Sequence, residues 1–391
     1  MIYDFSKILN RENTASVKYD LREKLFGNPN VVPMWVADMD FPTPDFIIKR
    51  IEQRLMHPIL GYTFRDDDYN ACISNWLSKR HGWNVEKQWL SFCPGIVAGL
   101  NHAVQAFTKN GDKVLIQTPV YHPFFYAVQQ NGRRLVENLL LNNGKRYNID
   151  FKLFDKQLRK GVKLFILCNP HNPVGRVWTL DELSRIAELC LKHKVLVIAD
   201  EIHADLIFAP HKHIPFASLS DEVSNITITF GSASKTFNIA GLATAYAVIS
   251  NEMNLKKYNL QLERNGTNMG NVLGFEATKG AYSPQGEEWL MQLLDYLKGN
   301  VDFVRDFVSQ KIPKIKLTEP EGTYLLWLDF RELGLNNKEL TKILIQKVGV
   351  GFNTGEVFGE NGSGFQRMNI ACPRSIIEKV LNDLSTVFSK F

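Results

Sequence analysis

Between about residues 85 and 250, the sequence alternates short apolar runs with longer amphipathic stretches. Four runs, at residues 113–117, 164–168, 195–199 and 226–230, have the length and composition of buried strands. The stretch 179–193 has apolar residues at helical spacing, with Thr179 as a candidate N-cap and Glu182 three positions later. Strands that alternate with helices in this way form a mostly parallel sheet covered by helices. The sequence therefore predicts an α/β fold.

The chain has 391 residues, which is more than one small core requires, so a second unit is expected. Residues 287–307 have the pattern of one long helix, and a strand-like stretch (322–330) and a helical one (337–347) follow it. Residues 1–47 are rich in Asn and Pro and are expected to be irregular and to fold back onto this second unit. We predict a large α/β domain at 48–287 and a smaller α+β domain formed by 288–391 with the N-terminal arm 1–47.

Composition excludes several classes of function. The formal net charge of +5 is small and no block of Lys or Arg occurs, so no nucleic-acid partner is expected. No apolar run reaches the roughly 18 residues of a membrane helix, and the N-terminus does not resemble a signal peptide. The five cysteines are odd in number and show no CxxC spacing, which indicates reduced thiols. We therefore expect a cytoplasmic protein without membrane contact.

Lys235 follows the apolar run 226–230 and is set among the small residues Ser232, Ser234 and Thr236. Open α/β sheets bind ligands outside the carboxyl ends of their strands. A lysine at such a position can form an imine with an aldehyde, and a site that lowers its pKa makes it a base. Taken alone, the motif also fits a solvated lysine in a loop.

Asp200 follows the apolar run 195–199 and is therefore expected at the same edge of the sheet as Lys235. A carboxylate there can keep a pyridine nitrogen protonated, because a nearby opposite charge favours the charged form. Taken alone, an aspartate that caps the next helix is the more common explanation.

Asn172 lies in the segment 168–175, which follows another apolar run and contains two Asn-Pro pairs. These pairs favour extended or turn geometry, so the segment can present an amide side chain at the same edge of the sheet. The alternative is a loop in which the same residues serve only backbone geometry.

Residues 94–100 contain Gly95 and Gly99 and have the pattern of a helix start. Free backbone N–H groups and the helix dipole at such a start attract phosphate. Each of the four motifs is weak by itself, but the four together are far rarer by chance than any one of them.

These motifs in their order, with Tyr121 and Arg367, resemble the fold-type I pyridoxal phosphate enzymes of the class I and II aminotransferase family over nearly the whole chain. Within that family, residues 34–42, 61–62, 200–203 and 232–242 resemble the MalY-type cystathionine β-lyases. The resemblance implies that the large domain binds pyridoxal 5'-phosphate (PLP).

The resemblance also implies a role for each matching residue. Lys235 is expected to attach PLP as a Schiff base and to move the substrate's α-proton. Asp200 is expected to pair with the pyridinium nitrogen, Asn172 to hydrogen-bond the phenolic oxygen, and Tyr121 to stack on the ring. Arg367 is expected to bind the substrate carboxylate as a bidentate pair, with Val36 as a second substrate contact.

The phosphate group of PLP is expected to be bound by several groups at once. The resemblance assigns this role to the backbone amides of Val97 and Ala98, to the Ser232 hydroxyl and to Tyr62 of a neighbouring subunit, which implies a homodimer. Two positions depart from the family pattern. His203, still expected at the cofactor, replaces a common tyrosine, and Ala243 replaces a frequent arginine. Backbone N–H groups are therefore expected to carry more of the phosphate's charge.

The implied function is a PLP-dependent carbon–sulfur β-lyase that cleaves cystathionine or related cysteine S-conjugates to pyruvate, ammonia and a thiol. A PLP-dependent aminotransferase is the alternative, because both reactions begin with loss of the α-proton and use nearly the same residues. A regulatory role as binding partner of a transcription factor is a lesser alternative.

No metal is expected. His211 and His213 have a spacing that could serve two metal ligands, but no Cys or carboxylate cluster completes a set, so both are expected in a solvent-exposed loop. The acidic run at 66–68 is expected to be a solvated turn or a helix start rather than a calcium site.

Overall fold

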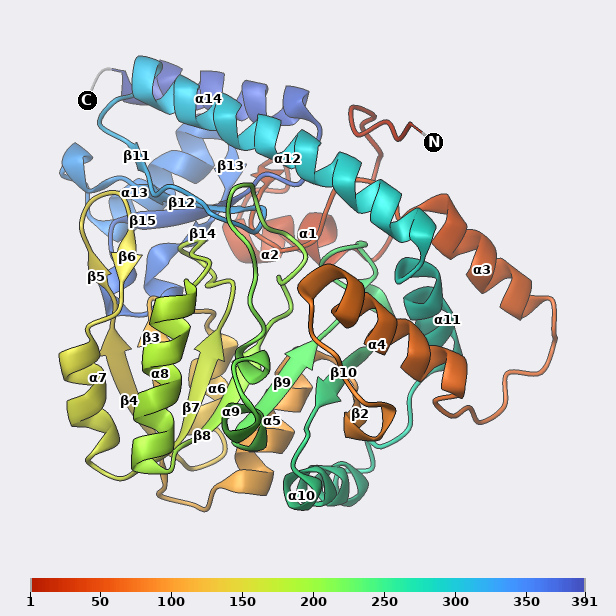
Figure 1. Cartoon of the computed structure of the whole chain (residues 1–391). Helices are drawn as coiled ribbons and strands as arrows, with labels where there is room; N and C mark the ends of the chain where they lie inside the picture. The colour runs from red at the N-terminus through yellow and green to blue at the C-terminus, as the bar shows by residue number, and fades with distance from the viewer. Residues whose placement is uncertain (1, 390–391) are drawn as a thin grey trace.

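A seven-stranded sheet forms the centre of the lower part of the molecule in this computed structural model, which describes residues 2–389 (Figure 1). The strand order is β2-β10-β9-β8-β7-β3-β4, and every pair in it is parallel except the two that β10 makes. The strands are β2 (Leu90–Cys93), β3 (Lys113–Thr118), β4 (Arg134–Leu139), β7 (Val162–Cys168), β8 (Leu196–Asp200), β9 (Thr227–Gly231) and β10 (Ala245–Val248).

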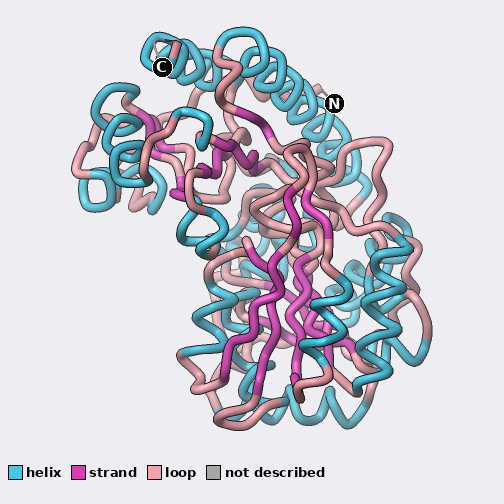
Figure 2. Tube along the Cα trace, turned by 90° about the vertical axis from the view of Figure 1, so that its left-hand side faces the viewer, coloured by secondary structure: helices cyan, strands magenta, loops and turns pink. Residues whose placement is uncertain are grey.

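Both faces of this sheet are buried. Successive residues of a strand point to opposite faces, and in β3 Val114 and Ile116 belong to one apolar cluster while Leu115 belongs to another. Figure 2 shows the strands enclosed by helices on either side. Helices α5 (Ile96–Phe107), α6 (Pro123–Gln129) and α10 (Glu252–Arg264) contribute to one cluster, and α7 (Phe151–Leu158) and α8 (Leu180–His193) to the other. This arrangement confirms the predicted α/β fold.

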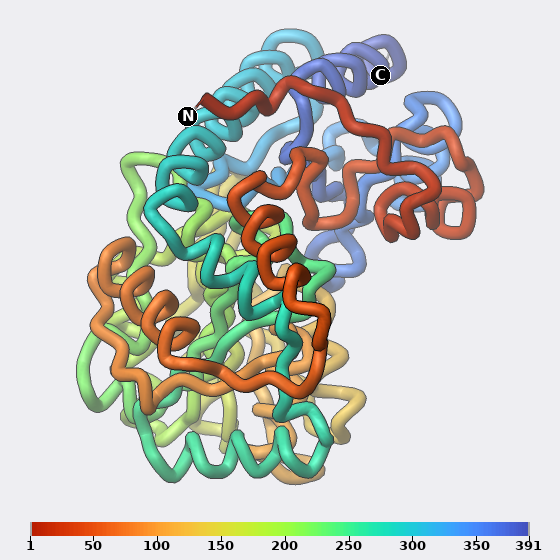
Figure 3. Tube along the Cα trace, turned by 90° about the vertical axis from the view of Figure 1, so that its right-hand side faces the viewer, coloured from red at the N-terminus to blue at the C-terminus, as the bar shows by residue number. Residues whose placement is uncertain are grey.

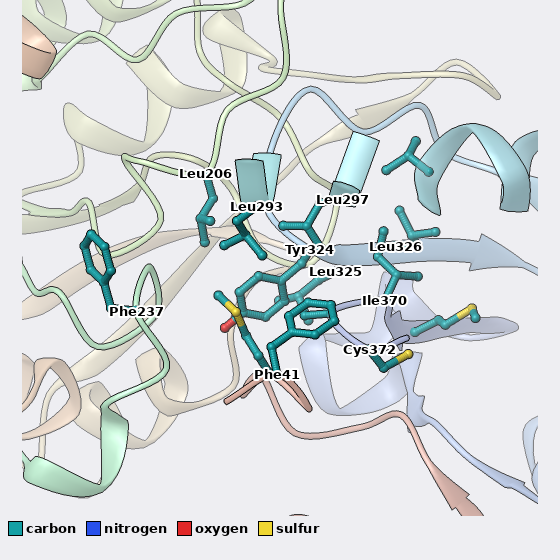
Figure 4. Packing of buried hydrophobic residues seen from close by; sticks show 14 of the residues in the cluster. Phe41, Leu206, Phe237, Leu293, Leu297, Tyr324, Leu325, Leu326, Ile370 and Cys372 are labelled. Carbon is teal, nitrogen blue, oxygen red and sulfur yellow. The ribbon is translucent and has the colours of Figure 1, made fainter. Parts of the chain in front are cut away.

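A smaller antiparallel sheet lies above the first one, with the order β11-β12-β15-β14. Its strands are β11 (Lys316–Leu317), β12 (Leu325–Asp329), β14 (Asn353–Thr354) and β15 (Phe365–Asn369). The helices around it are α12 (Pro284–Lys311), α13 (Asn337–Ile343) and α14 (Arg374–Phe388). The long α12 lies beside α14 across the top of the molecule in Figure 1. Its buried Leu293 and Leu297 lie in one apolar cluster with Phe41 and Tyr324 (Figure 4).

The N-terminal segment is more regular than predicted. It forms the short helices α1 (Val17–Asp20) and α2 (Arg22–Phe26), because the prolines of the segment lie outside residues 17–26. The expected return to the C-terminal part is confirmed. Strand β1 (Val32–Pro33) pairs in parallel with β13 (Val350–Gly351), and Figure 3 shows the segment lying against that part of the chain.

The four predicted strands are present, with ends shifted by at most two residues. Thr179 and Glu182 form the predicted capping box at the start of α8. The helix predicted at 337–347 is α13, which continues as a π-helical turn, η5 (Leu344–Val348). The predicted domain boundaries fall inside two helices, α3 (Asp45–Leu55) and α12, so the division into domains stays a prediction.

The remaining elements complete the two parts. The remaining α-helices and strands are α4 (Asp67–His81), α9 (Asp221–Asn225), α11 (Val272–Ala281), and the two-stranded pair β5 (Leu141–Asn142) and β6 (Tyr147–Asn148). Asp66 caps α4 by accepting the backbone N–H of Tyr69, so the acidic run is the start of a helix, as one of the two predicted alternatives has it. Across residues 2–389, none of the helices combines the length and apolar character that a membrane crossing requires.

Candidate active site

A cavity of about 290 Å³ lies at the carboxyl ends of β7, β8 and β9 and beside the start of α5. Lys235, Asp200, Asn172 and Tyr121 all line it, although they come from four separate segments of the sequence. The parallel strands bring their carboxyl ends to one edge of the sheet, which explains why these side chains lie around one cavity.

Lys235 is positioned by the turn that follows β9. Its Nζ donates a hydrogen bond to the carbonyl oxygen of Ala37, at 2.6 Å. Burial lowers the pKa of Lys235 to about 8, against the opposing effect of Asp38. A lysine with such a pKa is partly neutral near neutral pH, so it can attack a carbonyl or accept a proton.

Asp200 is the last residue of β8, and its exposed fraction is only 4%. Burial raises the pKa of Asp200 to about 7, and a hydrogen bond from the backbone N–H of Ile202 opposes this rise. A buried carboxyl group of this kind gains most from a cationic partner. The protonated nitrogen of a heterocycle in the cavity would be such a partner.

The first turn of α5 forms one end of the cavity, where Val97 and Ala98 line it. Gly95 precedes this turn with φ 128°, a conformation that favours glycine, and no side chain caps the helix. The N–H groups of a first turn lack partners within the helix, so this end can bind a phosphate. Ala243 also lines the cavity, so a small side chain occupies the position where relatives of the implied family often have an arginine.

Ser232 lies just outside the cavity. Its hydroxyl donates to the carbonyl oxygen of Thr244 at 2.8 Å and accepts the backbone N–H of Ser234 at 3.0 Å. Ser234 is the serine of this segment that lines the cavity. The structure therefore does not place the predicted Ser232 hydroxyl among the groups that face a phosphate.

Arg367 is buried in β15 next to the cavity, with an exposed fraction of 3%. Its Nη1 donates to Asn172 Oδ1 at 3.0 Å, and its Nη2 donates to the carbonyl oxygen of Trp35 and to Asn353 Oδ1, at 2.8 and 2.6 Å. All three partners are neutral, and its Nε has no partner within the described residues. Burial lowers the pKa of Arg367 to about 10. Since a buried cation without a counter-charge is costly, this site favours an anionic ligand.

The other predicted residues lie in different surroundings. His203 lines the cavity, its Nδ1 has no partner within residues 2–389, and burial lowers its pKa to about 3. Val36 is not among the residues that line the cavity; its carbonyl oxygen accepts from Asn369 Nδ2. Tyr62 lies in the loop between α3 and α4 with an exposed fraction of 97%, away from the cavity of its own chain.

Ala37 is a member of the site that sequence reasoning missed. Its carbonyl oxygen accepts from both Lys235 Nζ and the Tyr324 hydroxyl, the latter at 3.0 Å. A backbone carbonyl has no residue-type signal, so only its place within the stretch 34–42 could have indicated it. Tyr324 was missed because it lies just before β12 and belongs to none of the motifs at the edge of the large sheet.

One prediction about the histidines is wrong. His211 is exposed as expected, but His213 is buried, because its Nε2 forms a 3.0 Å hydrogen bond with the buried carboxylate of Glu201. Within the described part of the chain, no group of three or more candidate ligands could hold a metal ion.

The groups around the cavity match the parts of PLP one by one. Lys235 offers an amine for the aldehyde, Asp200 a carboxyl for the pyridine nitrogen, and Asn172 an amide beside them. The Tyr121 ring can cover one face of a flat heterocycle, and the start of α5 can receive the phosphate. The residues present therefore fit this cofactor.

Comparison with known proteins agrees with this geometry. The family model described as aminotransferase class I and II matches residues 29–384. Cystathionine beta-lyase PatB of Bacillus subtilis is 42% identical over 99% of this chain and 100% of its own. Protein MalY of Escherichia coli is 35% identical over 97% of both chains. The crystal structure of cystalysin from Treponema denticola, which contains PLP, covers 100% of both chains with a TM-score of 0.96 and 37% identity.

Proposed function

The chain belongs to the class I and II aminotransferase family, and we propose that it is a PLP-dependent carbon–sulfur β-lyase that cleaves cystathionine or a related cysteine S-conjugate. The products are pyruvate, ammonia and a thiol. The observation that carries this function is the 42% identity to a cystathionine beta-lyase over 99% of the chain, in a protein that keeps a lysine, a carboxylate and an amide around one cavity.

PLP is the cofactor, and when bound it supplies an aldehyde that condenses with amines and a pyridinium ring that takes up negative charge from the substrate's α-carbon. Asp200 would keep the ring nitrogen protonated, and its raised pKa reflects a burial that leaves it in need of a cation. Tyr121 would hold the ring from one face, and the N–H groups at the start of α5 would orient the phosphate.

The substrate would be bound through its carboxylate by Arg367, whose buried guanidinium contacts only neutral groups in this chain. Lys235 Nζ would then accept the α-proton, because its lowered pKa makes the neutral amine available. The same amine, now protonated, can return a proton to the departing sulfur atom. Loss of the β-thiolate rather than transfer of the amino group distinguishes the lyase from an aminotransferase.

We also propose that the protein is a homodimer. The loop between α3 and α4 exposes large apolar side chains within a few residues, at fractions from 59% to 97%: Met56, Ile59, Leu60, Tyr62 and Phe64. An apolar group of this size on a surface is typical of a protein interface. A second copy that covers this loop would bring Tyr62 out of solvent and toward a neighbouring active site, as the resemblance implies.

The cytoplasm is the compartment we propose. The five cysteines are free thiols, and four of them are buried, which fits a reducing environment.

The activity is tested by product analysis. The purified protein, loaded with PLP, is incubated with cystathionine, with cysteine, and with pairs of an amino acid and a 2-oxo acid. A lyase releases pyruvate and a thiol in equal amounts from cystathionine without any 2-oxo acid. Formation of new amino acids that depends on the 2-oxo acid, without pyruvate, would instead establish the aminotransferase alternative.

A further inference from the structure

A second cavity of about 290 Å³ lies in the smaller part of the molecule, between the N-terminal segment, η5 and the edge of the sheet at β14. Most of the residues that line it are apolar, among them the buried Leu344, Val350 and Phe352. Among its described lining residues none carries a charge. The cavity therefore favours an uncharged and mainly apolar ligand.

Aromatic side chains form one wall of this cavity. Phe26 and Trp35 both line it and contact each other edge to face, with ring centroids 6.0 Å apart. The Phe26 ring also lies directly against Gly351, where an added Cβ would come within 2.7 Å of it. Trp35 is held in place by its own Nε1, which donates to the carbonyl oxygen of Lys18 at 3.1 Å. The wall is therefore built from fixed contacts on both rings.

Four polar side chains interrupt the apolar lining, Thr341, Asn353, Thr354 and Gln366, and two of them have atoms that are unpartnered within the described part of the chain. Thr354 of β14 and Gln366 of β15 lie directly opposite each other in the sheet, so their side chains share one face. Both line the cavity, and neither Thr354 Oγ1 nor Gln366 Nε2 has a hydrogen-bond partner within residues 2–389. Gln366 has an exposed fraction of only 2%. A buried polar atom without a partner destabilises the protein, so a ligand that supplies the missing partner gains binding free energy.

We propose that this cavity is a second ligand site, for an uncharged molecule with an apolar body and one amide-like polar end. A carbonyl oxygen of the ligand accepts from Gln366 Nε2, and an N–H or O–H group of the ligand donates to Thr354 Oγ1. The apolar body packs against the aromatic wall and the side chains of η5.

The site adjoins the groups that hold Arg367. Trp35 and Asn353 line the cavity, and both accept hydrogen bonds from Arg367 Nη2. A ligand that shifts either residue would change the position of the guanidinium. This link to substrate affinity rests on the proposed function, whereas the binding itself does not. Binding is therefore measured directly, so a protein without lyase activity could still confirm the second site.

The probes are benzamide, which has an apolar ring and an amide end, and toluene, which has the ring alone. Binding to the PLP-loaded protein is measured by titration calorimetry. We expect one benzamide per chain, with a Kd that rises about fivefold in Gln366→Leu, because one hydrogen bond is lost. Thr354→Val, which keeps the shape of the side chain, is expected to raise the Kd by a similar factor. The affinity for toluene is expected to stay the same or to increase in both variants.

Gln130→Leu makes the same chemical change on an exposed position of the larger part and is expected to leave the Kd for benzamide unchanged. Absence of benzamide binding to the unmodified protein would overturn the proposal. An equal Kd in the unmodified protein, Gln366→Leu and Thr354→Val would overturn it as well. Thr354→Val only replaces a hydroxyl group by a methyl group of similar size. It therefore gives a valid result even if Gln366→Leu does not fold.

Discussion

Arg367 Nη1 donates a 3.0 Å hydrogen bond to Asn172 Oδ1, so the residue proposed to bind the substrate carboxylate is joined directly to one that lines the cofactor cavity. The two residues come from different parts of the fold, β15 of the smaller sheet and the loop after β7. Through this contact, the position of the substrate depends on how the two parts of the molecule fit together.

Arg367→Lys is expected to raise KM for cystathionine by about 10- to 100-fold, because an ammonium cannot replace the several hydrogen bonds of the guanidinium. PLP binding is expected to persist. Pyruvate formation at increasing substrate concentration measures the change. Arg331→Lys, on a half-exposed arginine paired with Asp329, is the matched control and should leave KM unchanged. An unchanged KM in Arg367→Lys would show that another group binds the carboxylate.

Asp200→Ala is expected to lower kcat by about 100-fold or more, because the ring nitrogen of PLP loses the group that keeps it protonated. KM is expected to change little, since Arg367 rather than Asp200 is proposed to bind the substrate carboxylate. Steady-state kinetics separates the two constants. A variant with normal kcat would remove Asp200 from the reaction.

The stability of the cofactor-free protein is expected to depend on pH through Asp200. Its pKa is about 7 in the folded protein, against 3.8 for an unperturbed aspartate, so the folded state binds the proton more tightly. The protonated carboxyl therefore adds up to about 4 kcal/mol to the free energy of unfolding. This stabilisation is fully present below pH 3.8 and is lost as the pH rises through about 7.

Urea unfolding of the cofactor-free protein at pH 5 and pH 8 tests this dependence, with Asp200→Asn as the comparison. The unmodified protein should lose stability relative to Asp200→Asn between the two values. Added PLP should reduce the loss, because it supplies a cationic partner. Equal pH dependence of stability in both proteins would mean that burial does not raise the pKa of Asp200.

Trans complementation tests the proposed homodimer. Lys235→Ala and Tyr62→Ala are each expected to have low activity alone. If Tyr62 completes the partner's site, a refolded equimolar mixture contains about half mixed dimers, each with one intact site, and recovers about a quarter of the normal activity. A mixture no more active than its components, or sedimentation at 44.7 kDa in the active protein, would contradict the shared site.

The sequence predicted the central sheet well, because buried parallel strands such as 164–168 are continuous apolar runs that mark their own positions. It also predicted that Lys235, Asp200 and Asn172 meet, because carboxyl ends of parallel strands share one edge. It did not predict the hydrogen bond between Ala37 and Lys235, since a backbone carbonyl has no side-chain signal. The hydrogen bond from the Ser232 hydroxyl to Thr244 was equally hidden, because the sequence does not determine the rotamer of a serine in the segment after β9.

Attachment of PLP to Lys235 is the feature on which the proposed lyase reaction depends most. Reduction of the PLP-loaded protein with borohydride, followed by mass spectrometry of its peptides, measures it directly. We predict a pyridoxyl phosphate adduct on the peptide that contains Lys235, and none in Lys235→Ala, which should also release almost no pyruvate from cystathionine. An adduct on another lysine, or its persistence in Lys235→Ala, would contradict the assignment.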